Sequence, residues 1–306
     1  MSRPDLEGLA AFCAVVEAGG VAAAAQRLGL TKSAVSKRVS DLEATLGASL
    51  LTRTSRGLVL TEPGQAFYTR ARRLLDDLDA AIEEIGGDDG PLTGALRIAA
   101  PMSFGRLHLA PALIAFASEH RDLALALDCD DRFVDIAGGG YDLAIRIGQL
   151  ADSSLIAKKL ARSPRVVAAS PAYVAAHGAP ERPEDLVHHA CIWYANSTAV
   201  NLWRFAPETP GGDPLVVPVR GRLHVNNGEI IREAAIAGLG IIIQPLFMVS
   251  DALARGDLVR LLPDHPPTED GVYALYPPGR NLSRKVRACL DHLAAAFADP
   301  PWLKGT

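Results

Sequence analysis

The chain has 306 residues, of which 49% are hydrophobic and 22% are charged. This length exceeds what one hydrophobic core usually organises and predicts two or three domains, while the composition excludes a disordered, collagen-like or purely coiled-coil protein. No apolar run approaches the roughly 20 residues of a membrane-spanning helix, and the first residues lack the pattern of a signal peptide. We therefore expect a cytoplasmic protein that does not enter a membrane.

The net charge of −4 conceals a basic segment near the start of the chain. Residues 26–60 hold six Lys and Arg side chains but only two Asp and Glu side chains, a local balance of +4. A patch of this kind is typical of a surface that binds phosphate, although a solvated helix face often carries as many cations.

Residues 6–46 predict three short helices. An apolar helical pattern first ends at a pair of glycines, and an alanine-rich helical segment, residues 21–28, follows it. Gly29 suits the left-handed position that ends a helix, and Thr31 suits the N-cap of the next helix. The second and third helices are therefore joined by a tight glycine turn.

The third helix, residues 32–46, has two contrasting faces. One face is apolar at positions spaced by three or four residues, whereas the opposite face carries short hydroxyl side chains between lysines. Two helices joined by a tight turn, the second with a small and basic outer face, predict a helix-turn-helix that reads DNA in the major groove.

Residues 51–60 predict a wing beside this helix. Two short β-prone pieces flank a turn that is rich in Arg, Ser and Gly. The alternative is a surface hairpin whose arginines are only solvated. The residues of the third helix and the wing that we expect to contact DNA are Thr31, Lys32, Ser33, Ser36, Lys37, Arg38, Arg53, Thr54 and Arg56.

The same segments carry a family resemblance. Residues 28–47, which include Ser33-Ala-Val-Ser36, and residues 51–57 and 60–64 resemble, in order and spacing, the N-terminal domain of LysR-type transcriptional regulators. One departure is Leu51, where that family usually has Phe, and we expect only slight repacking there. The resemblance implies that the chain begins with a winged helix-turn-helix DNA-binding domain.

Residues 63–86 predict a long linker helix, because Pro63 suits a first helical turn and no breaker follows before Gly86. At about 1.5 Å per residue the helix spans roughly 35 Å, so its apolar stripe needs a partner, either a second copy of the chain or its own domain. The family resemblance implies the second copy, hence a homodimer and, by analogy, a homotetramer. The residues of the predicted dimer seam are Phe67, Ala71, Leu74, Leu78, Ala81 and Ile85.

From residue 92 onward, short apolar strands alternate with helices, which predicts a parallel α/β architecture. The expected strands are 96–100, 123–127, 143–147, 165–169, 241–243 and 272–276, and the expected helices are 106–120, 228–237, one from 247, and 283–297. Residues 141–148, 169–173 and 237–240 resemble the effector-binding region of LysR-type regulators, which is similar to periplasmic binding proteins. This resemblance implies two subdomains, two crossover strands and an effector cleft between the subdomains.

The predicted fold is an N-terminal all-α winged helix-turn-helix with a long linker helix, followed by an α/β periplasmic-binding-protein-like effector domain of two subdomains. The predicted boundaries are 1–62 for the DNA-binding domain, 63–86 for the linker helix, 87–91 for a glycine-rich hinge, 92–162 plus 268–306 for the first effector subdomain, and 163–267 for the second.

The predicted effector cleft lies at the ends of strands, where open α/β folds bind ligands. The residues that resemblance to the family assigns to it are Ser103, Phe104, Arg146, Trp193, Asn226 and Asn227. Ser103 and Phe104 follow a predicted strand and open a helix, whose N-terminus favours negative charge. With Arg146 as a cation, the cleft suits a small organic anion.

Each of these residues also has a purely structural explanation. Ser103 can cap the helix that follows it. Arg146 can form an ion pair with Asp128 or Asp142 inside the domain. The run Asn226-Asn-Gly228 is a signal for a turn and an N-cap before it is a signal for a ligand site.

The sequence contains no recognised motif of an enzyme, a metal site or a cofactor site. Its four cysteines form no close pair, and Cys129 and Cys191 could bond only if the fold brought them into disulfide range. We therefore predict a ligand-responsive, DNA-binding transcriptional regulator without a cofactor or a metal. Its expected partners are double-stranded DNA, a small-molecule effector and copies of itself. The first alternative is a cytoplasmic solute-binding module without sequence-specific DNA binding, and the second is an enzyme with an unrecognised active site.

Overall fold

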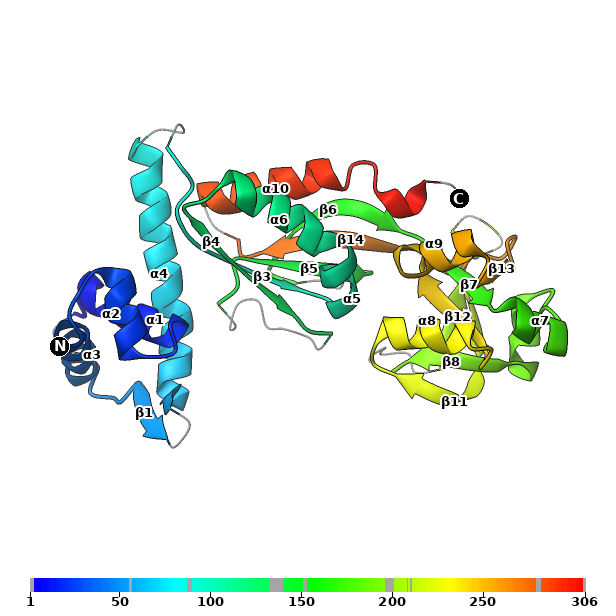
Figure 1. The fold of residues 1–306 in the computed structure, drawn as a ribbon, viewed down its shortest axis with the longest axis horizontal. Helices are drawn as coiled ribbons and strands as arrows, with labels where there is room; N and C mark the ends of the chain where they lie inside the picture. Colours follow the sequence, from blue (N-terminus) through cyan, green and yellow to red (C-terminus); the bar gives the residue numbers. More distant parts are fainter. Residues whose placement is uncertain are drawn as a thin grey trace. The chain divides into compact units, whose positions relative to one another are not determined.

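The computed structural model contains two compact units, which Figure 1 shows as ribbons. The first unit covers Met1–Leu92, Asp135–Tyr141 and Gly279–Arg287, and the second covers Thr93–Val134, Asp142–Pro278 and Ala288–Thr306. The residues that the structure describes are 3–54, 57–86, 90–131, 140–150, 153–195, 201–207, 209, 211–278 and 282–304; for 54, 76, 79–80 and 83–86 it describes the backbone only.

The first unit contains three short helices, a β-hairpin and one long helix. Its elements are α1 (Leu6–Glu17), α2 (Val21–Leu28), α3 (Lys32–Leu46), β1 (Leu51–Thr54), β2 (Gly57–Leu60) and α4 (Glu62–Gly86). The strands β1 and β2 pair antiparallel. This arrangement confirms the predicted helix-turn-helix, wing and linker helix, and α4 begins one residue earlier than predicted.

Local backbone preferences explain the turn between α2 and α3. Gly29 has a φ of 64°, a left-handed conformation that glycine adopts without the steric penalty of a side chain. Thr31 then caps α3, because its side chain accepts a hydrogen bond from the N–H of Ala34 at 3.2 Å. Both predictions for this turn are confirmed.

The core of the first unit lies between α1, α2, α3 and the first turns of α4. The ring of Phe12 is fully buried, and its centroid lies 5.8 Å from that of Phe67 and 6.3 Å from that of Tyr68. Leu51, where LysR-type regulators usually have Phe, is partly buried and packs against this core. The first turns of α4 are thus anchored to the helix-turn-helix by aromatic contacts.

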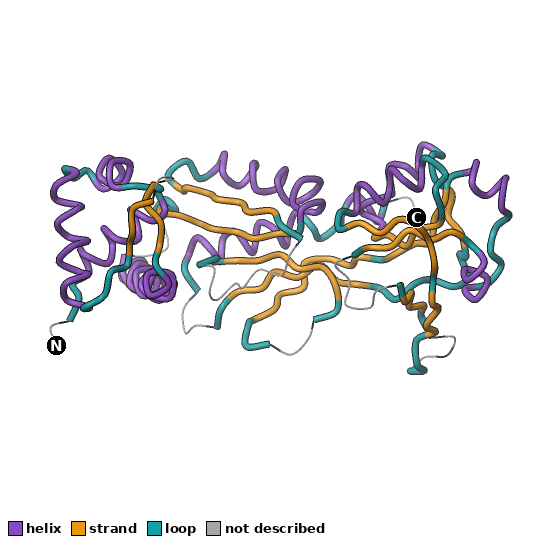
Figure 2. The backbone as a smooth tube through the Cα atoms, turned by 90° about the horizontal axis from the view of Figure 1, so that it is seen from below, coloured by secondary structure: helices purple, strands orange, loops and turns teal. Residues whose placement is uncertain are grey.

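The second unit contains two five-stranded sheets with helices packed on them (Figure 2). The first sheet has the order β4-β3-β5-β14-β6. In Figure 1, the helices α6 and α10 run along this sheet. The two helices contact each other where Nε2 of His292 in α10 lies 2.9 Å from the carbonyl oxygen of Ala112 in α6. Its elements are β3 (Gly94–Ala100), α5 (Met102–Phe104), α6 (Ala110–Glu119), β4 (Leu123–Cys129), β5 (Leu143–Gly148), β6 (Ile156–Ser163), β14 (Asp270–Tyr276) and α10 (Arg284–Ala296).

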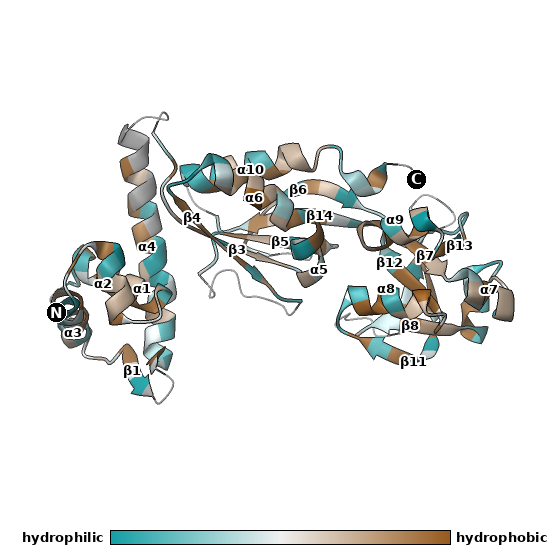
Figure 3. Cartoon of the chain, in the orientation of Figure 1, coloured by the Kyte–Doolittle hydropathy of each residue, from teal (hydrophilic) through white to brown (hydrophobic). Residues whose placement is uncertain are grey.

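The second sheet has the order β11-β8-β12-β7-β13. Its central strand β12 is coloured as strongly hydrophobic in Figure 3, and its isoleucines are buried, which confirms the predicted buried strand. The elements are β7 (Arg165–Ala169), α7 (Pro171–His177), β8 (Ala190–Tyr194), β11 (Arg220–Val225), α8 (Gly228–Ile236), β12 (Ile241–Pro245), α9 (Leu246–Arg255) and β13 (Val259–Leu261), beside a separate hairpin of β9 (Leu202–Phe205) and β10 (Leu215–Pro218).

Both sheets are mixed, so the prediction of a parallel sheet is wrong. The chain leaves the first sheet along β6 and enters the second along β7, with only Pro164 between the two strands. It returns from β13 to β14, and both β7 and β14 run antiparallel to their neighbours. Apolar residues indicate that a strand is buried, but they do not indicate its direction relative to the neighbouring strands. The sequence therefore could not distinguish a parallel sheet from the mixed sheets of the structure.

The predicted helix 106–120 begins earlier and is not uniform. Helical structure starts at Met102, passes through a π-helical turn over Gly105–Leu109 and continues as α6. A Cβ atom at Gly105 would overlap with Sγ of Cys129 on β4, so a larger residue there would have to displace that thiol.

The described residues contain no helix long and apolar enough to cross a membrane. Nor do they contain a group of three or more His, Cys, Asp or Glu side chains that could hold a metal ion. None of the four cysteines, all of which the structure describes, forms a disulfide, and Cys129 and Cys191 lie on strands of different sheets. The redox pair considered from the sequence is therefore not formed.

Candidate functional site

The outer face of α3 carries the side chains that we expect to read DNA. Val35, Val39 and Leu42 are buried and hold the opposite face of the helix against the core. Short hydroxyl side chains allow a helix to lie deep in the major groove, and lysines beside them can reach base edges and phosphates. The exposed residues at the start of α3 and on its outer face are Thr31, Lys32, Ser33, Ser36, Lys37 and Ser40.

Three of the predicted DNA contacts, Thr31, Ser33 and Arg38, already have partners inside the protein. Arg38 Nη2 lies 2.6 Å from Glu7 Oε2, an ion pair between α3 and the start of α1. The hydroxyl of Thr31 caps α3 and also lies 3.0 Å from Oγ of Ser33. A phosphate contact by Arg38 would therefore compete with the carboxylate of Glu7.

The wing is tied to α3 by Glu43. Its Oε1 accepts hydrogen bonds from the N–H groups of Leu50 and Leu51, at 2.7 and 3.1 Å. Arg53 is exposed on β1, where it can approach DNA beside the helix. The side chain of Thr54 and the whole of Arg56 lie outside the described residues. Glu43 thus sets the position of the wing relative to α3.

The first turns of α4 pack inside their own unit, which corrects two residues of the predicted dimer seam. Ala71 is 1% exposed in the core of the helix-turn-helix, and Phe67 is partly buried against that core. The cause is α1, whose Phe12 ring covers this part of α4. A heptad pattern predicts that a stripe is covered but does not say by what.

Beyond these turns, the apolar stripe of α4 is open. Leu74 is 58% exposed, and Ile82, which the predicted seam did not include, is 59% exposed. Ala81 is exposed and Leu78 is half-buried, whereas the side chain of Ile85 lies outside the described residues. Leu74, Leu78 and Ile82 follow each other at steps of four and therefore lie on one face of the helix.

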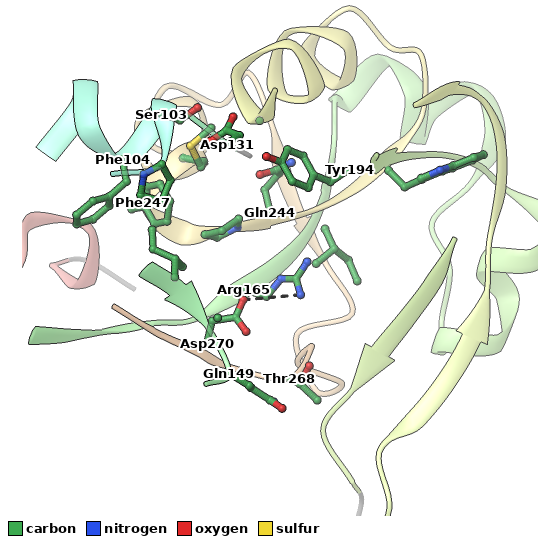
Figure 4. A pocket seen from close by; sticks show the side chains of 18 of the residues that line it. Ser103, Phe104, Asp131, Gln149, Arg165, Tyr194, Gln244, Phe247, Thr268 and Asp270 are labelled. Atoms are coloured by element: carbon green, nitrogen blue, oxygen red, sulfur yellow. Dashed lines mark ion pairs between the residues drawn. The ribbon is translucent and has the colours of Figure 1, made fainter. Parts of the chain in front are cut away.

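A cavity of about 550 Å³ in the second unit is lined by residues of both sheets. Four of the predicted effector residues, Ser103, Phe104, Arg146 and Trp193, belong to its lining. Figure 4 shows the cavity with side chains of other lining residues around it. These include Asp131, Gln149, Arg165, Tyr194, Gln244, Phe247, Thr268 and Asp270.

Ser103 lines the cavity and is not a helix cap. It is 7% exposed, and its Oγ has no hydrogen-bond partner within the described residues. The N-cap position of α5 is Pro101 instead, and the N–H of Met102 donates to Oδ1 of Asp131 at 2.8 Å. A carboxylate of the protein therefore already occupies the helix N-terminus that we expected to face an effector.

Phe104 lines the cavity and at the same time belongs to a buried aromatic cluster. Its side chain is fully buried. Its ring centroid lies 5.3 Å from that of Phe247 in α9 and 5.8 Å from that of Trp302. His108 lies against the same rings. With Phe297, five aromatic side chains from three parts of the chain thus meet beside the cavity.

Arg146 is half-buried on β5, and burial lowers the pKa of its guanidinium from the ordinary value. The two carboxylates considered as its partners contact Arg97 in the structure. Asp128 lies 3.9 Å from Nη2 of Arg97, and Asp142 accepts a hydrogen bond from the backbone N–H of Arg97 at 2.7 Å. Arg146 itself belongs to the cavity lining and places a guanidinium there.

Trp193 brings an aromatic surface and a hydrogen-bond donor to the cavity. Its ring stacks on His224 at a centroid distance of 5.7 Å and an interplanar angle of 10°. Its Nε1 is buried without a hydrogen-bond partner among the residues that the structure describes. A ligand with an acceptor oxygen would satisfy this donor.

Asn226 and Asn227 do not line the cavity, which corrects their predicted role. Asn227 caps α8, because its side-chain oxygen accepts hydrogen bonds from the N–H groups of Glu229 and Ile230, at 2.9 and 3.1 Å. Asn226 is exposed. The next residue, Gly228, reaches the cavity with its backbone.

Comparison with known proteins decides the family. Residues 6–65 match the family described as "Bacterial regulatory helix-turn-helix protein, lysR family", and residues 89–298 match the LysR substrate binding domain. The chain belongs to the LysR-type transcriptional regulators. The two matched regions coincide with the helix-turn-helix unit and with the part of the chain that builds the two sheets.

Individual relatives agree with this family over nearly the whole chain. The HTH-type transcriptional regulator PtxR of Pseudomonas aeruginosa is 37% identical over 302 residues, which are 99% of this chain and 96% of PtxR. The regulator DmlR of Escherichia coli is 36% identical over 297 residues, 97% of this chain and 95% of DmlR. The solved structure of CrgA from Neisseria meningitidis has a TM-score of 0.60 at 32% identity and covers 97% of this chain and 100% of CrgA.

This LysR-type protein is a ligand-responsive, DNA-binding transcriptional regulator. The alternative of a solute-binding module without DNA binding is set aside, because the helix-turn-helix itself matches the family. The family is one of regulators and not of enzymes.

Sequence reasoning missed several residues that line the cavity. Arg165 and Asp270 line the cavity as a pair, with Nη1 of Arg165 3.8 Å from Oδ2 of Asp270. Burial raises the pKa of the Asp270 carboxyl, and the charge of Arg165 offsets part of that shift. Gln244, 4% exposed, is a polar residue in the apolar strand β12, and that interruption is a signal that could have indicated it.

Proposed function

We propose that this LysR-type regulator binds double-stranded DNA as a homodimer, reads it with α3 and the wing, and responds to a small organic anion in the cavity of its second unit. The observation that carries the sensing proposal is the pair of buried donors, Ser103 Oγ and Trp193 Nε1, that lack partners within the described residues of the cavity wall. Such a regulator acts on DNA, so we place it in the cytoplasm.

The proposal assigns DNA contacts to the outer face of α3. Ser36 and Lys37 lie on this face, exposed, and we assign them to base edges in the major groove. Arg53 on the wing strand is assigned to phosphate. The remaining proposed contacts are Thr31, Lys32, Ser33, Arg38, Thr54 and Arg56.

The proposal assigns the dimer contact to the open part of α4. Leu74 and Ile82 are more than half exposed and lie on one face with Leu78. An exposed apolar stripe of this kind on a long helix is typical of a seam with a second helix. A homotetramer would need a further interface, and its support is the analogy with other LysR-type regulators.

The anion is supported by the balance of donors and acceptors around the cavity. Two acidic groups of the lining are engaged within the protein, since Asp131 accepts from the N–H of Met102 and Asp270 lies beside Arg165. A buried donor without a partner costs about 1–3 kcal/mol, and a carboxylate ligand would remove that penalty. Arg146 favours the same charge.

The test is a thermal-shift screen that compares small carboxylates with their neutral amides. Binding should raise the melting temperature of the wild type and of the control Ser118→Ala, a variant of an exposed serine on α6. The gain in stability is about 2.7 kcal/mol at a ligand concentration of 100 times Kd. Ser103→Ala should show smaller shifts with the carboxylates. Equal shifts in all three proteins, or shifts with neutral and cationic compounds only, would exclude the anion.

A further inference from the structure

Glu17, the last residue of α1, joins three helices of the DNA-binding unit. Its Oε2 lies 2.7 Å from Nη1 of Arg27 in α2. Its Oε1 accepts a hydrogen bond from the hydroxyl of Tyr68 at 3.3 Å and lies 3.4 Å from Nε of Arg72, both on α4. One carboxylate thus connects the helix-turn-helix to the linker helix.

This junction differs from the surface ion pairs of the same unit by its burial. The side chains of Glu17 and Arg72 are only 9% and 11% exposed, whereas the side chain of Glu7, which pairs with Arg38, is 71% exposed. Charges shielded from water interact more strongly than exposed charges, and removal of one partner of a buried pair destabilises the protein more. The Glu17 junction is therefore better able to fix a geometry than the exposed pair of Glu7 and Arg38.

Apolar contacts lie beside the Glu17 junction and also hold α1 against α4. Phe12 of α1 packs on Phe67 and Tyr68 of α4, and burial of apolar surface is not directional. Hydrogen bonds and ion pairs, in contrast, depend on distance and angle. The carboxylate of Glu17 adds this directional contact at the point where α1 ends.

We propose that Glu17 is a positioning residue that sets the spacing at which the two α3 helices of a dimer meet DNA, by fixing the angle between the helix-turn-helix and α4. The inference rests on the proposed homodimer. A dimer held along α4 places its two helix-turn-helix units according to this angle, whereas a single unit on a single half-site does not depend on it.

The length of α4 makes the angle important. From Arg72 to Gly86 the helix extends about 21 Å at about 1.5 Å per residue, so a tilt of about 10° displaces its end by about 4 Å. This displacement is comparable to one base-pair step of about 3.4 Å along the axis of DNA. A small change at the junction is therefore equivalent to a change of one base pair in half-site spacing.

The experiment measures how the affinity of the full chain depends on half-site spacing. A duplex is first selected with the wild type from random-sequence DNA, and its central spacer is then shortened or lengthened by one and two base pairs. The variants are Glu17→Gln and Tyr68→Phe, with Glu17→Asp as the conservative rescue. Glu7→Gln is the matched control for the spacing preference, because Glu7 lies on the same helix and also pairs with an arginine. Since this variant releases Arg38, its affinity for each spacer is compared with its own affinity for the best spacer. A duplex with one half-site is measured in parallel.

The wild type and Glu7→Gln should lose about tenfold in affinity for each base pair away from the best spacer, since a dimer gains from its second site only when the geometry permits it. Glu17→Gln should show a flattened or shifted spacing preference with unchanged affinity for the single half-site, and Glu17→Asp should restore part of the preference. If Glu17→Gln does not fold, the same measurement is made on Tyr68→Phe, which removes only a hydroxyl and should also flatten or shift the spacing preference.

Two results would overturn the inference while the proposed dimer stands: an unchanged spacing preference in both Glu17→Gln and Tyr68→Phe, or a parallel loss of affinity for the single half-site. The second result would show that Glu17 only maintains the fold of the unit. A wild type without any spacing preference would instead contradict the proposed dimer, and the inference with it.

Discussion

Ser103 and Phe104 are neighbours in the chain but have different surroundings. The hydroxyl of Ser103 meets the cavity, whereas Phe104 is fully buried among rings from α9 and the end of the chain. We therefore expect Phe104→Ala to lower the free energy of unfolding by about 3–5 kcal/mol, because it leaves a void among packed rings. Denaturant titration measures this value. Ser103→Ala is the control and should change it far less, and equal losses would contradict the assignment.

The residues of α3 and the wing should differ in what they contribute to binding. Ser36→Ala or Lys37→Ala should weaken binding to the preferred DNA by about 1–3 kcal/mol and relax sequence preference, as expected for lost base contacts. Arg53→Ala should weaken binding to all sequences and reduce the salt slope by about 1, as expected for a phosphate contact. Affinity measured against salt, on preferred and scrambled duplexes, separates the two. Lys159→Ala, an exposed lysine of β6, is the control.

His108 makes stability depend on pH. Burial lowers the pKa of its imidazole, and the hydrogen bond to the carbonyl oxygen of Phe247, at 3.1 Å from Nε2, opposes that shift in part. At His108 the unfolded chain then binds a proton more readily than the folded protein does. The free energy of unfolding therefore keeps its full value above the ordinary histidine pKa of about 6.5 and decreases as the pH falls below that pKa. Unfolding free energies at about pH 7.5 and about pH 5.5 should differ more in the wild type than in His108→Gln. A larger difference in the variant would contradict this.

At the scale of elements, local sequence signals account for much of the fold. The turn at Gly29 and Thr31 follows from backbone and capping preferences within a few residues, and so could be predicted. The strand β6 could not, because its sequence Ile-Ala-Lys-Lys-Leu-Ala-Arg-Ser lacks regular apolar alternation and its inner side chains are covered by distant segments. Contacts such as Arg38 with Glu7, separated by 31 residues, also depend on tertiary packing.

As for the fold, part of the candidate site could be predicted from the sequence and part could not. The loop after β3 could be placed at the cavity from its position at a strand end, and Ser103 lines the cavity. The burial of Phe104 could not be foreseen, since Phe247 and Trp302 are far away in the chain. The domain boundaries proposed from the sequence remain predictions.

The contact between α4 and the wing depends on one glycine. A Cβ atom at Gly64 would overlap with the carbonyl oxygen of Leu50, so α4 can begin close to the wing only without a side chain there. Gly64→Ala should lower the free energy of unfolding by about 1–3 kcal/mol and weaken DNA binding, because the wing or α4 must move. Gly90→Ala is the control, since a Cβ atom there would meet its nearest neighbour at 3.7 Å. Equal stability of the two variants in denaturant would contradict the contact.

At the scale of the whole molecule, the proposed dimer depends on the open stripe of α4. Leu78→Asp would place a carboxylate between apolar side chains of two copies, which is strongly unfavourable without a partner charge. Sedimentation should show monomers, and affinity for a two-half-site duplex should fall with them. Ala66→Asp, at an exposed position earlier in the same helix, is the control and should remain oligomeric. Unchanged oligomers in Leu78→Asp would assign Leu78 to packing within one copy.

The most direct test of the regulator as a dimeric reader of DNA is a footprint of the full chain on the DNA upstream of its own gene, repeated over a range of salt concentrations. We expect two protected half-sites on one face of the duplex, about 10 base pairs or a multiple apart, and affinity that falls steeply as salt rises. Protection of a single half-site, or equal and weak binding along all DNA at every salt concentration, would contradict it.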